Sequence, residues 1–417
     1  DDAQAANRAA VAFIVCPLFL VGGMAASPDA PMSAAWLGSL AFAARAVSLL
    51  RASTPRGLGH DEASSTSGSL SSRHAIWTIT AGGVLGIAFL AKYSAALLGI
   101  AFVLALASRQ CAPLLRRPTS WIAATIAFLL ASPPLVWNAT HDWASIRHRL
   151  DWTQSESGLS LRNLGAWAGG QILYLTPLVA VVGIAVLLFL WRNRARSAAH
   201  RLVALATFVP MVPLSLLCLW SRVAEPHWML PVWLALPAVI PGALALPDAD
   251  RPWALRTPSL RWAAGSGLAL VAILHLHVLT DLAPRLLPAS LYDPRFDLAH
   301  DLRGWPEVAS RVERAARRAR TGVALALHWT TCAQLDLALR ARRSTIAVGC
   351  LTPERDDYDD WAPELAARAD AIVVVDGRWT DAPHRRMPLP SRGGARRLDV
   401  VRIERGGRVV RTFELWR

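Results

Sequence analysis

One lysine stands alone in this chain, and it interrupts a long apolar segment. Residues 75–108 read AIWTITAGGVLGIAFLAKYSAALLGIAFVLALAS, with Lys92 near the midpoint. An ammonium group inside a membrane is costly unless a partner neutralises it, so an intramembrane lysine indicates a functional site. The partner that we expect for Lys92 is a lipid phosphate. The alternative is that Lys92 extends to the outer headgroups and serves only as an anchor.

Other polar groups lie in short segments between apolar runs. Asp29 lies in SPDAP, Arg222 and Glu225 lie in SRVAEPHW, and residues 138–163 mix hydrogen-bond donors, tryptophans and charges. Three ionisable side chains in the six residues 222–227 are unusual for a turn that only connects two spans. Structural roles remain open for all of these groups: a helix cap for Asp29, an ion pair between Arg222 and Glu225, and interface anchoring for the tryptophans.

The composition is that of a protein that crosses a membrane many times. Hydrophobic residues make up 53% of the chain, the mean hydropathy is +0.32, and there are 18 tryptophans. Several apolar runs approach the length that spans a bilayer. The net charge of +14 does not indicate nucleic-acid binding, because most arginines before residue 262 lie in short loops between apolar runs. We therefore predict a polytopic α-helical membrane bundle and no nucleic-acid partner.

The arginine-rich loops also predict the topology, because such loops stay in the cytoplasm. Arginines flank the run around Lys92 on both sides, so we predict a hairpin whose turn, at Lys92 and Tyr93, faces outward. Each arm has about 16 residues, or about 24 Å, which is less than the roughly 30 Å hydrocarbon layer. We therefore expect the turn to lie below the outer surface. The nine predicted spans are residues 9–26, 32–50, the two arms of 75–108, 119–137, 165–191, 202–220, 229–246 and 262–280.

Three local features complete the prediction for the membrane part. Residues 51–74 are rich in Ser, Thr and Gly and are expected to form a flexible cytoplasmic loop. Ser132-Pro133-Pro134 is expected to kink or end its helix. Gly82, Gly83 and Gly86 give one helix a face of small residues that permits close packing against a neighbour.

From Asp281 onward the composition changes to that of a soluble α/β domain. Apolar strands are expected at 322–327, 344–349 and 371–375, helices at 306–320, 332–342 and 361–368, and a hairpin of strands 398–404 and 408–415 around Gly406-Gly407. We predict a membrane domain at 1–280 and an extracytoplasmic accessory domain at 281–417. Cys332 and Cys350 are open to two interpretations, a disulfide outside the cytoplasm or two buried thiols.

Several segments, taken in order, resemble bacterial membrane glycosyltransferases of the dolichyl-phosphate-mannose protein mannosyltransferase and aminoarabinose transferase kind, which have the GT-C fold. The matching pieces are SPDAP at 27–31, LAKYS at 90–94, Trp137-Asn138 with His141-Asp142-Trp143, Gly170-Gln171, Arg222 with EPHW at 225–228, and Arg303-Gly304-Trp305. They span most of the chain.

The resemblance implies an enzyme that moves a sugar from a polyprenyl-phosphate donor to a hydroxyl of a glycan, lipid or protein at the outer face of the inner membrane. Cations would stabilise the leaving phosphate and a carboxylate would deprotonate the acceptor. No cofactor is assigned, and a divalent metal ion is left open, with its ligands unknown. The predicted site has catalytic Asp29 and Glu225, phosphate-binding Lys92, Arg147 and Arg222, and substrate-binding Tyr93, Asn138, His141, Asp142, Trp143, Gln171, His227 and Trp228.

The family usually has an earlier span and a first external loop with an Asp-Glu pair that holds the catalytic base. No external segment here supplies that pair. The chain begins with Asp1, and residues 1–8 contain no signal-peptide n-region. We therefore expect an N-terminally truncated chain, either a piece of an active enzyme or an inactive remnant.

Two other classes of function compete with the transferase. A transporter or lipid flippase would couple Lys92 and Glu225 to the movement of an ion or lipid, but the sequence shows no internal repeat of the kind that transporters often have. A mere membrane anchor for the C-terminal domain is disfavoured, because one span would suffice.

Overall fold

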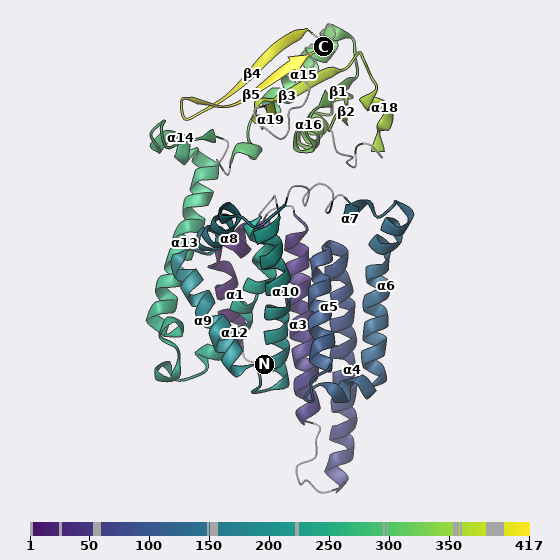
Figure 1. Cartoon of the computed structure of the whole chain (residues 1–417), viewed down its shortest axis with the longest axis vertical. Helices are drawn as coiled ribbons and strands as arrows, with labels where there is room; N and C mark the ends of the chain where they lie inside the picture. The colour runs from purple at the N-terminus through teal and green to yellow at the C-terminus, as the bar shows by residue number, and fades with distance from the viewer. Residues whose placement is uncertain are drawn as a thin grey trace. The chain divides into compact units, whose positions relative to one another are not determined.

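The computed structural model describes residues 3–24, 27–52, 60–147, 150, 157–221, 225–294, 297, 299–352, 358, 361–380 and 396–417. The chain forms two compact units, Asp1–Ala272 and Ile273–Arg417, which are considered separately (Figure 1). The division falls inside helix α13 (Thr257–Thr280), whereas the sequence analysis placed the domain boundary just after that helix.

The described part of the first unit is helical. Six of its helical segments are long and apolar enough to cross a membrane, and a bent pair of helices raises the number to seven. The predicted polytopic helical bundle is confirmed in this form, while the count of nine spans is not. The helices are α1 (Ala3–Ile14), α2 (Pro17–Met24), α3 (Asp29–Ala52), α4 (His60–Ala91), α5 (Ala96–Leu106), α6 (Pro118–Thr140), α7 (Ala144–Arg147), α8 (Leu161–Leu175), α9 (Pro177–Asn193), α10 (Ala198–Trp220), α11 (Leu230–Trp233), α12 (Ala235–Leu244) and α13.

Two predicted spans are broken helices, and a proline follows each break. The span at 9–26 divides into α1 and α2, and α2 begins at Pro17. The span at 165–191 divides into α8 and α9, which meet at 103°. Thr176 has φ +73° at this bend, directly before Pro177. The proline ring disfavours a helical conformation in the preceding residue, so the chain turns there.

The predicted hairpin is present, and its turn lies at Lys92. Helix α4 ends at Ala91, Lys92 is extended, and a 3₁₀ turn, η1 (Tyr93–Ala95), leads into α5. Leu85 and Gly99 are equally far from Lys92 in the sequence, and a Cβ on Gly99 would lie 3.9 Å from the Leu85 side chain. The two arms therefore run back along one another.

The arms of this hairpin differ from the prediction. Helix α4 already begins at His60, so residues 60–74 are helical rather than a flexible loop, and residues 53–59 lie outside the described part. The second arm is short, since the apolar helical segment covers only Tyr93–Leu106. Helix α6 does not end at Ser132-Pro133-Pro134, which was one of the two predicted outcomes, because it continues through both prolines to Thr140. Prolines are tolerated in membrane helices when neighbouring groups satisfy the freed backbone carbonyls.

Helices α3, α4 and α6 pack side by side (Figure 1). Gly82 and Gly86 of α4 form the closest contact, because an added Cβ would lie 2.3 Å from the Ala123 carbonyl oxygen and 2.6 Å from Leu130 Cβ, respectively. Gly83 differs, as its added Cβ would meet only an ordinary contact at 3.8 Å. The predicted small-residue face thus reduces to two glycines one turn apart, which allow α4 and α6 to approach closely.

The second unit contains a five-stranded sheet in the order β2-β1-β3-β5-β4. Strands β1, β2 and β3 are parallel, and β5 pairs antiparallel with β3 and β4. The predicted strands and helices are confirmed except for the helix at 361–368, which is only one turn long. The elements after the last membrane helix are α14 (Leu282–Leu286), α15 (Trp305–Ala319), β1 (Val323–Ala326), α16 (Trp329–Ala341), β2 (Ala347–Cys350), α18 (Pro363–Ala366), β3 (Ile372–Asp376), α19 (Gly377–Thr380), β4 (Arg397–Arg405) and β5 (Arg408–Trp416).

Cys332 and Cys350 form a disulfide, with their Cα atoms 5.8 Å apart. The bond joins the first turn of α16 to the end of β2. The sequence left open a disulfide or two buried thiols, and the structure has the disulfide.

A buried ion pair lies at the end of β3. Arg411 Nη2 is 2.5 Å from Asp376 Oδ2, and both side chains are 1% exposed. Thr331 donates a hydrogen bond to the same carboxylate, and the Arg411 guanidinium lies 4.5 Å from the centre of the Trp305 ring. Burial, and then the nearby guanidinium charges, hold the pKa of the adjacent His300 below its usual value. The interior of this unit is thus held by a polar cluster as well as by apolar packing.

Candidate functional site

The partner of Lys92 in this structure is a carboxylate of its own chain. Lys92 Nζ lies 2.7 Å from Asp29 Oδ1 and 2.8 Å from Oδ2. Asp29 is in the first turn of α3, where the helix dipole favours an anion, and Lys92 directly follows the C-terminal end of α4, where the dipole favours a cation. The Asp29 side chain is 9% exposed and that of Lys92 is 25% exposed. An ammonium has three N–H donors, so Lys92 can hold Asp29 and still contact a second anion.

Two further ionisable groups extend this pair. His227 Nε2 lies 3.9 Å from Asp29 Oδ2, and His227 Nδ1 lies 3.5 Å from Glu225 Oε2. Both residues come from the segment between α10 and α11, where Glu225 precedes the 3₁₀ turn η4 (Pro226–Met229). Glu225, His227, Asp29 and Lys92 therefore follow one another as a row of ionisable groups that is partly open to solvent.

Tyr93 and Asn138 lie beside the Lys92 turn and bind each other. The Asn138 amide donates to Tyr93 Oη at 2.7 Å and to the Pro134 carbonyl at 2.8 Å, and its oxygen accepts from Ser145 N at 3.1 Å. Asn138 is 1% exposed. Its role in this structure is therefore to hold the end of α6 against the Lys92 turn, whereas Tyr93 is 40% exposed.

The loop after α6 carries His141, Asp142, Trp143 and Arg147, whose described contacts do not include Asp29 or Lys92. His141 stacks on Trp137, with ring centres 4.4 Å apart, and its Nδ1 is 2.8 Å from the Trp137 carbonyl. Asp142 and Trp143 both have positive φ, 52° and 56°, and form a tight turn. Arg147 is exposed at the end of α7, and within the described contacts nothing joins it to the Asp29–Lys92 pair.

Three predicted site residues remain, and the structure places each of them differently or does not describe it. Gln171 is buried and accepts a hydrogen bond from the Trp233 indole at 2.7 Å, which ties α8 to α11. Trp228 is half-buried in η4, and its backbone N–H bonds to the Glu225 carbonyl. Arg222 lies outside the described residues.

Asn163 is a positioning residue that sequence reasoning missed. Its side-chain amide donates to the carbonyls of Leu219 and Ser221, at 3.1 and 3.0 Å, at the C-terminal end of α10. The last carbonyls of a helix need such partners from outside the helix. Asn163 is itself placed by Ser160, whose hydroxyl caps the start of α8. These hydrogen bonds hold the C-terminal end of α10 against the start of α8. The Ser160-x-x-Asn163 spacing was the available signal, but it indicates only a helix start.

In the described part of the chain, no group of three or more His, Cys, Asp or Glu side chains is placed to hold a metal ion. Asp29, His227 and Glu225 do not surround a common point. Asp29 binds Lys92, and the two ring nitrogens of His227 face different carboxylates, those of Asp29 and Glu225.

Comparison with known proteins gives a match to a protein family. No curated protein and no solved structure matches the chain. Residues 67–137 match the family described as dolichyl-phosphate-mannose-protein mannosyltransferase. That segment runs from the first quarter of α4 through the Lys92 turn and α5 to nearly the end of α6. The part of the chain that carries Lys92 and Tyr93 is therefore similar to a family of membrane mannosyltransferases.

Proposed function

We propose that this protein is a membrane glycosyltransferase that moves a sugar from a polyprenyl-phosphate donor to an acceptor hydroxyl. The observation that carries the proposal is the ion pair between Lys92 and Asp29. Its lysine lies at the turn between α4 and α5, inside the segment that matches the mannosyltransferase family. The pair keeps an ammonium fixed at a helix end with one N–H donor free. A fixed, partly desolvated cation is the group that stabilises a phosphate as it leaves.

In the proposed reaction the acceptor oxygen forms a bond to the anomeric carbon, and the bond from that carbon to the phosphate oxygen breaks. The electron pair of the broken bond leaves with polyprenyl phosphate, whose new charge Lys92 stabilises. The acceptor proton passes to a carboxylate. Glu225 suits this step because its carboxylate is 44% exposed and lies beside His227. Asp29 then acts by orienting Lys92, and Tyr93 lines the same turn.

The reaction is tested with the purified full chain in liposomes that contain polyprenyl-phosphate [¹⁴C]mannose, with a membrane extract as the source of acceptors. We expect label to move from polyprenyl-phosphate mannose to an acceptor, which is separated from the donor by chromatography, while polyprenyl phosphate accumulates. A control lacks the protein. If the lipid-linked sugar instead reaches the opposite leaflet intact, the transporter or flippase alternative is correct and the transferase proposal fails.

We further propose that the site and the C-terminal unit lie outside the cytoplasm. Arg109, Arg116 and Arg117 lie in the connection between α5 and α6, and Arg194 and Arg196 lie in the connection between α9 and α10. Short loops rich in arginine are typical of the cytoplasmic side. The disulfide between Cys332 and Cys350 also suits an oxidising compartment. The inner membrane is the location that fits both features.

Reporter fusions test this topology. Alkaline phosphatase joined after Arg417 should be active and green fluorescent protein at the same position should be dark. The matched fusions after Gln110, in the arginine-rich connection between α5 and α6, should give the opposite result because that loop is expected in the cytoplasm. A fluorescent fusion after Arg417 would refute the outward placement of the C-terminal unit.

A further inference from the structure

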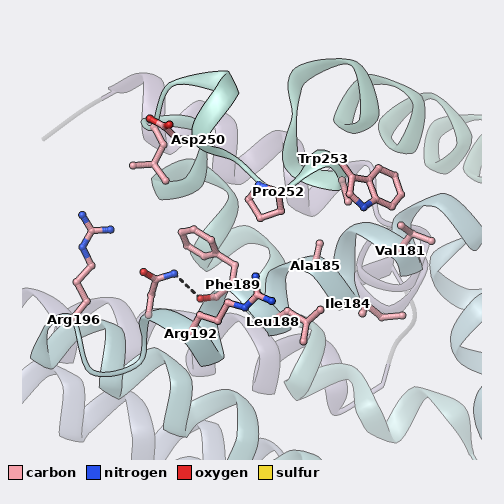
Figure 2. Close-up of a pocket in the computed structure, with 13 residues that line it drawn as sticks. Val181, Ile184, Ala185, Leu188, Phe189, Arg192, Arg196, Asp250, Pro252 and Trp253 are labelled. Carbon is pink, nitrogen blue, oxygen red and sulfur yellow. Dashed lines mark hydrogen bonds between the residues drawn. The ribbon is translucent and has the colours of Figure 1, made fainter.

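An apolar groove at the arginine-rich end of the first unit has no role in the proposed reaction. It lies between α9 and the segment that follows α12, and its volume is about 750 Å³. Figure 2 shows Ile184 and Leu188 along one wall, and Pro252 and Trp253 along the other. These side chains are apolar, and the exposed fractions of Ile184, Leu188 and Trp253 exceed one half. The groove is therefore a surface for a hydrocarbon chain.

Two cations lie at one end of this groove. Arg192 and Arg196 are exposed and line it together with the apolar residues. Among the described residues neither guanidinium has an ion-pair partner, whereas the neighbouring Arg194 lies over the Trp191 ring at 3.9 Å. Asp250 also lines the groove near Arg196 (Figure 2), so the lining carries two positive charges and one negative. An occupant must combine a long apolar part with an anionic end.

We propose that this groove binds an anionic glycerophospholipid. One acyl chain lies along Ile184, Leu188 and Trp253, and the phosphate lies between Arg192 and Arg196. The location fits the ligand, because tryptophan and arginine side chains at the end of a membrane helix are found at headgroup level. Charge complementarity selects the headgroup, since a basic residue near the surface attracts anionic lipids and not zwitterionic ones. The groove is lined from α9 and the segment after α12, while the Lys92 turn lies between α4 and α5, so this inference does not depend on the proposed transferase.

The test uses quenching of Trp253 by brominated lipids in nanodiscs that hold the full chain. The Trp253 signal is the difference between the natural chain and Trp253→Phe. Dibromo-phosphatidylglycerol should quench it at a mole fraction at least about fivefold lower than dibromo-phosphatidylcholine, because one basic residue near the surface favours an anionic lipid by roughly that factor.

A variant with Arg192→Gln and Arg196→Gln should lose this preference and respond equally to both lipids. The matched control carries Arg109→Gln and Arg116→Gln, which remove the same charge from exposed positions at the same end of the bundle and should leave the preference unchanged. Equal quenching of the natural chain by both lipids would overturn the proposal, as would an equal loss of preference in both double variants. Glycerol phosphate in solution should not relieve the quenching, because it lacks the acyl chain.

Discussion

Replacing Lys92 by methionine should lower the rate of sugar transfer from a polyprenyl-phosphate donor by about tenfold to a hundredfold. Methionine is unbranched like lysine and only one heavy atom shorter, and it removes the ammonium. A hydrogen bond to a charged group contributes about 1.5–3 kcal/mol, and each 1.36 kcal/mol in the barrier changes the rate tenfold. The measurement is the release of polyprenyl phosphate by the purified full chain. Unchanged kinetics would mean that Lys92 does not contact the leaving phosphate.

The same substitution also leaves the Asp29 carboxylate, which is 9% exposed, without its partner. A second variant separates the two effects. Combining Lys92→Met with Asp29→Asn removes both charges, so the thermal stability lost in the single variant should largely return, because no buried charge remains unpaired. The transfer rate should stay low. Recovery of the rate in the double variant would show that the pair only joins α3 to α4.

Asp376→Ala should destabilise the C-terminal unit more than any surface substitution. The change leaves the Arg411 guanidinium, which is 1% exposed, without a counter-charge. Removing one partner of a buried ion pair costs about 3–5 kcal/mol. With an m-value of about 2 kcal/mol per molar urea for a domain of this size, the unfolding midpoint should fall by about 2 M. Pulse proteolysis of the oxidised full chain in urea measures this midpoint.

An exposed ion pair of the same unit provides the control. Arg368 Nε lies 2.8 Å from Asp370 Oδ1, and both side chains are more than 40% exposed. The guanidinium lowers the pKa of Asp370 to about 2, yet exposed pairs contribute little to stability because water and salt screen them. Asp370→Asn should therefore leave the midpoint where it is. Equal shifts for Asp370→Asn and Asp376→Ala would contradict the role given to burial.

The local structure around Lys92 was predictable because one charged residue in an apolar run is an unambiguous signal. The strands of the C-terminal unit were predictable for a similar reason, since apolar and alternating runs bounded by turns define strands. The pairing of Lys92 with Asp29 was not predictable, because the two are 63 positions apart and no periodicity records such a contact. The bend at Thr176 did leave a signal in Pro177, but the hydrophobic pattern of residues 165–191 continues across the break.

The role of Asn138 illustrates a second limit. Its type and position beside the membrane suggested a substrate contact, yet the structure directs its amide to Tyr93 and Pro134. The sequence does not distinguish a polar side chain that binds a substrate from one that holds a helix end. Only the positions of the neighbouring groups in the structure distinguish the two roles. The same holds for Gln171, whose partner is the Trp233 indole.

The cross-link between Cys332 and Cys350 makes the stability of the C-terminal unit depend on how the protein is inserted. Closing a loop of 18 residues corresponds to about 3 kcal/mol in the loop-entropy account of disulfides. A copy inserted in the opposite orientation would keep both thiols in the reducing cytoplasm and would lack this contribution. Since a domain is stable by only about 5–15 kcal/mol, that copy would unfold more often and be degraded sooner. With the proposed outward placement of the C-terminal unit, the disulfide would therefore favour the survival of correctly inserted copies, by a route separate from the arginine-rich loops.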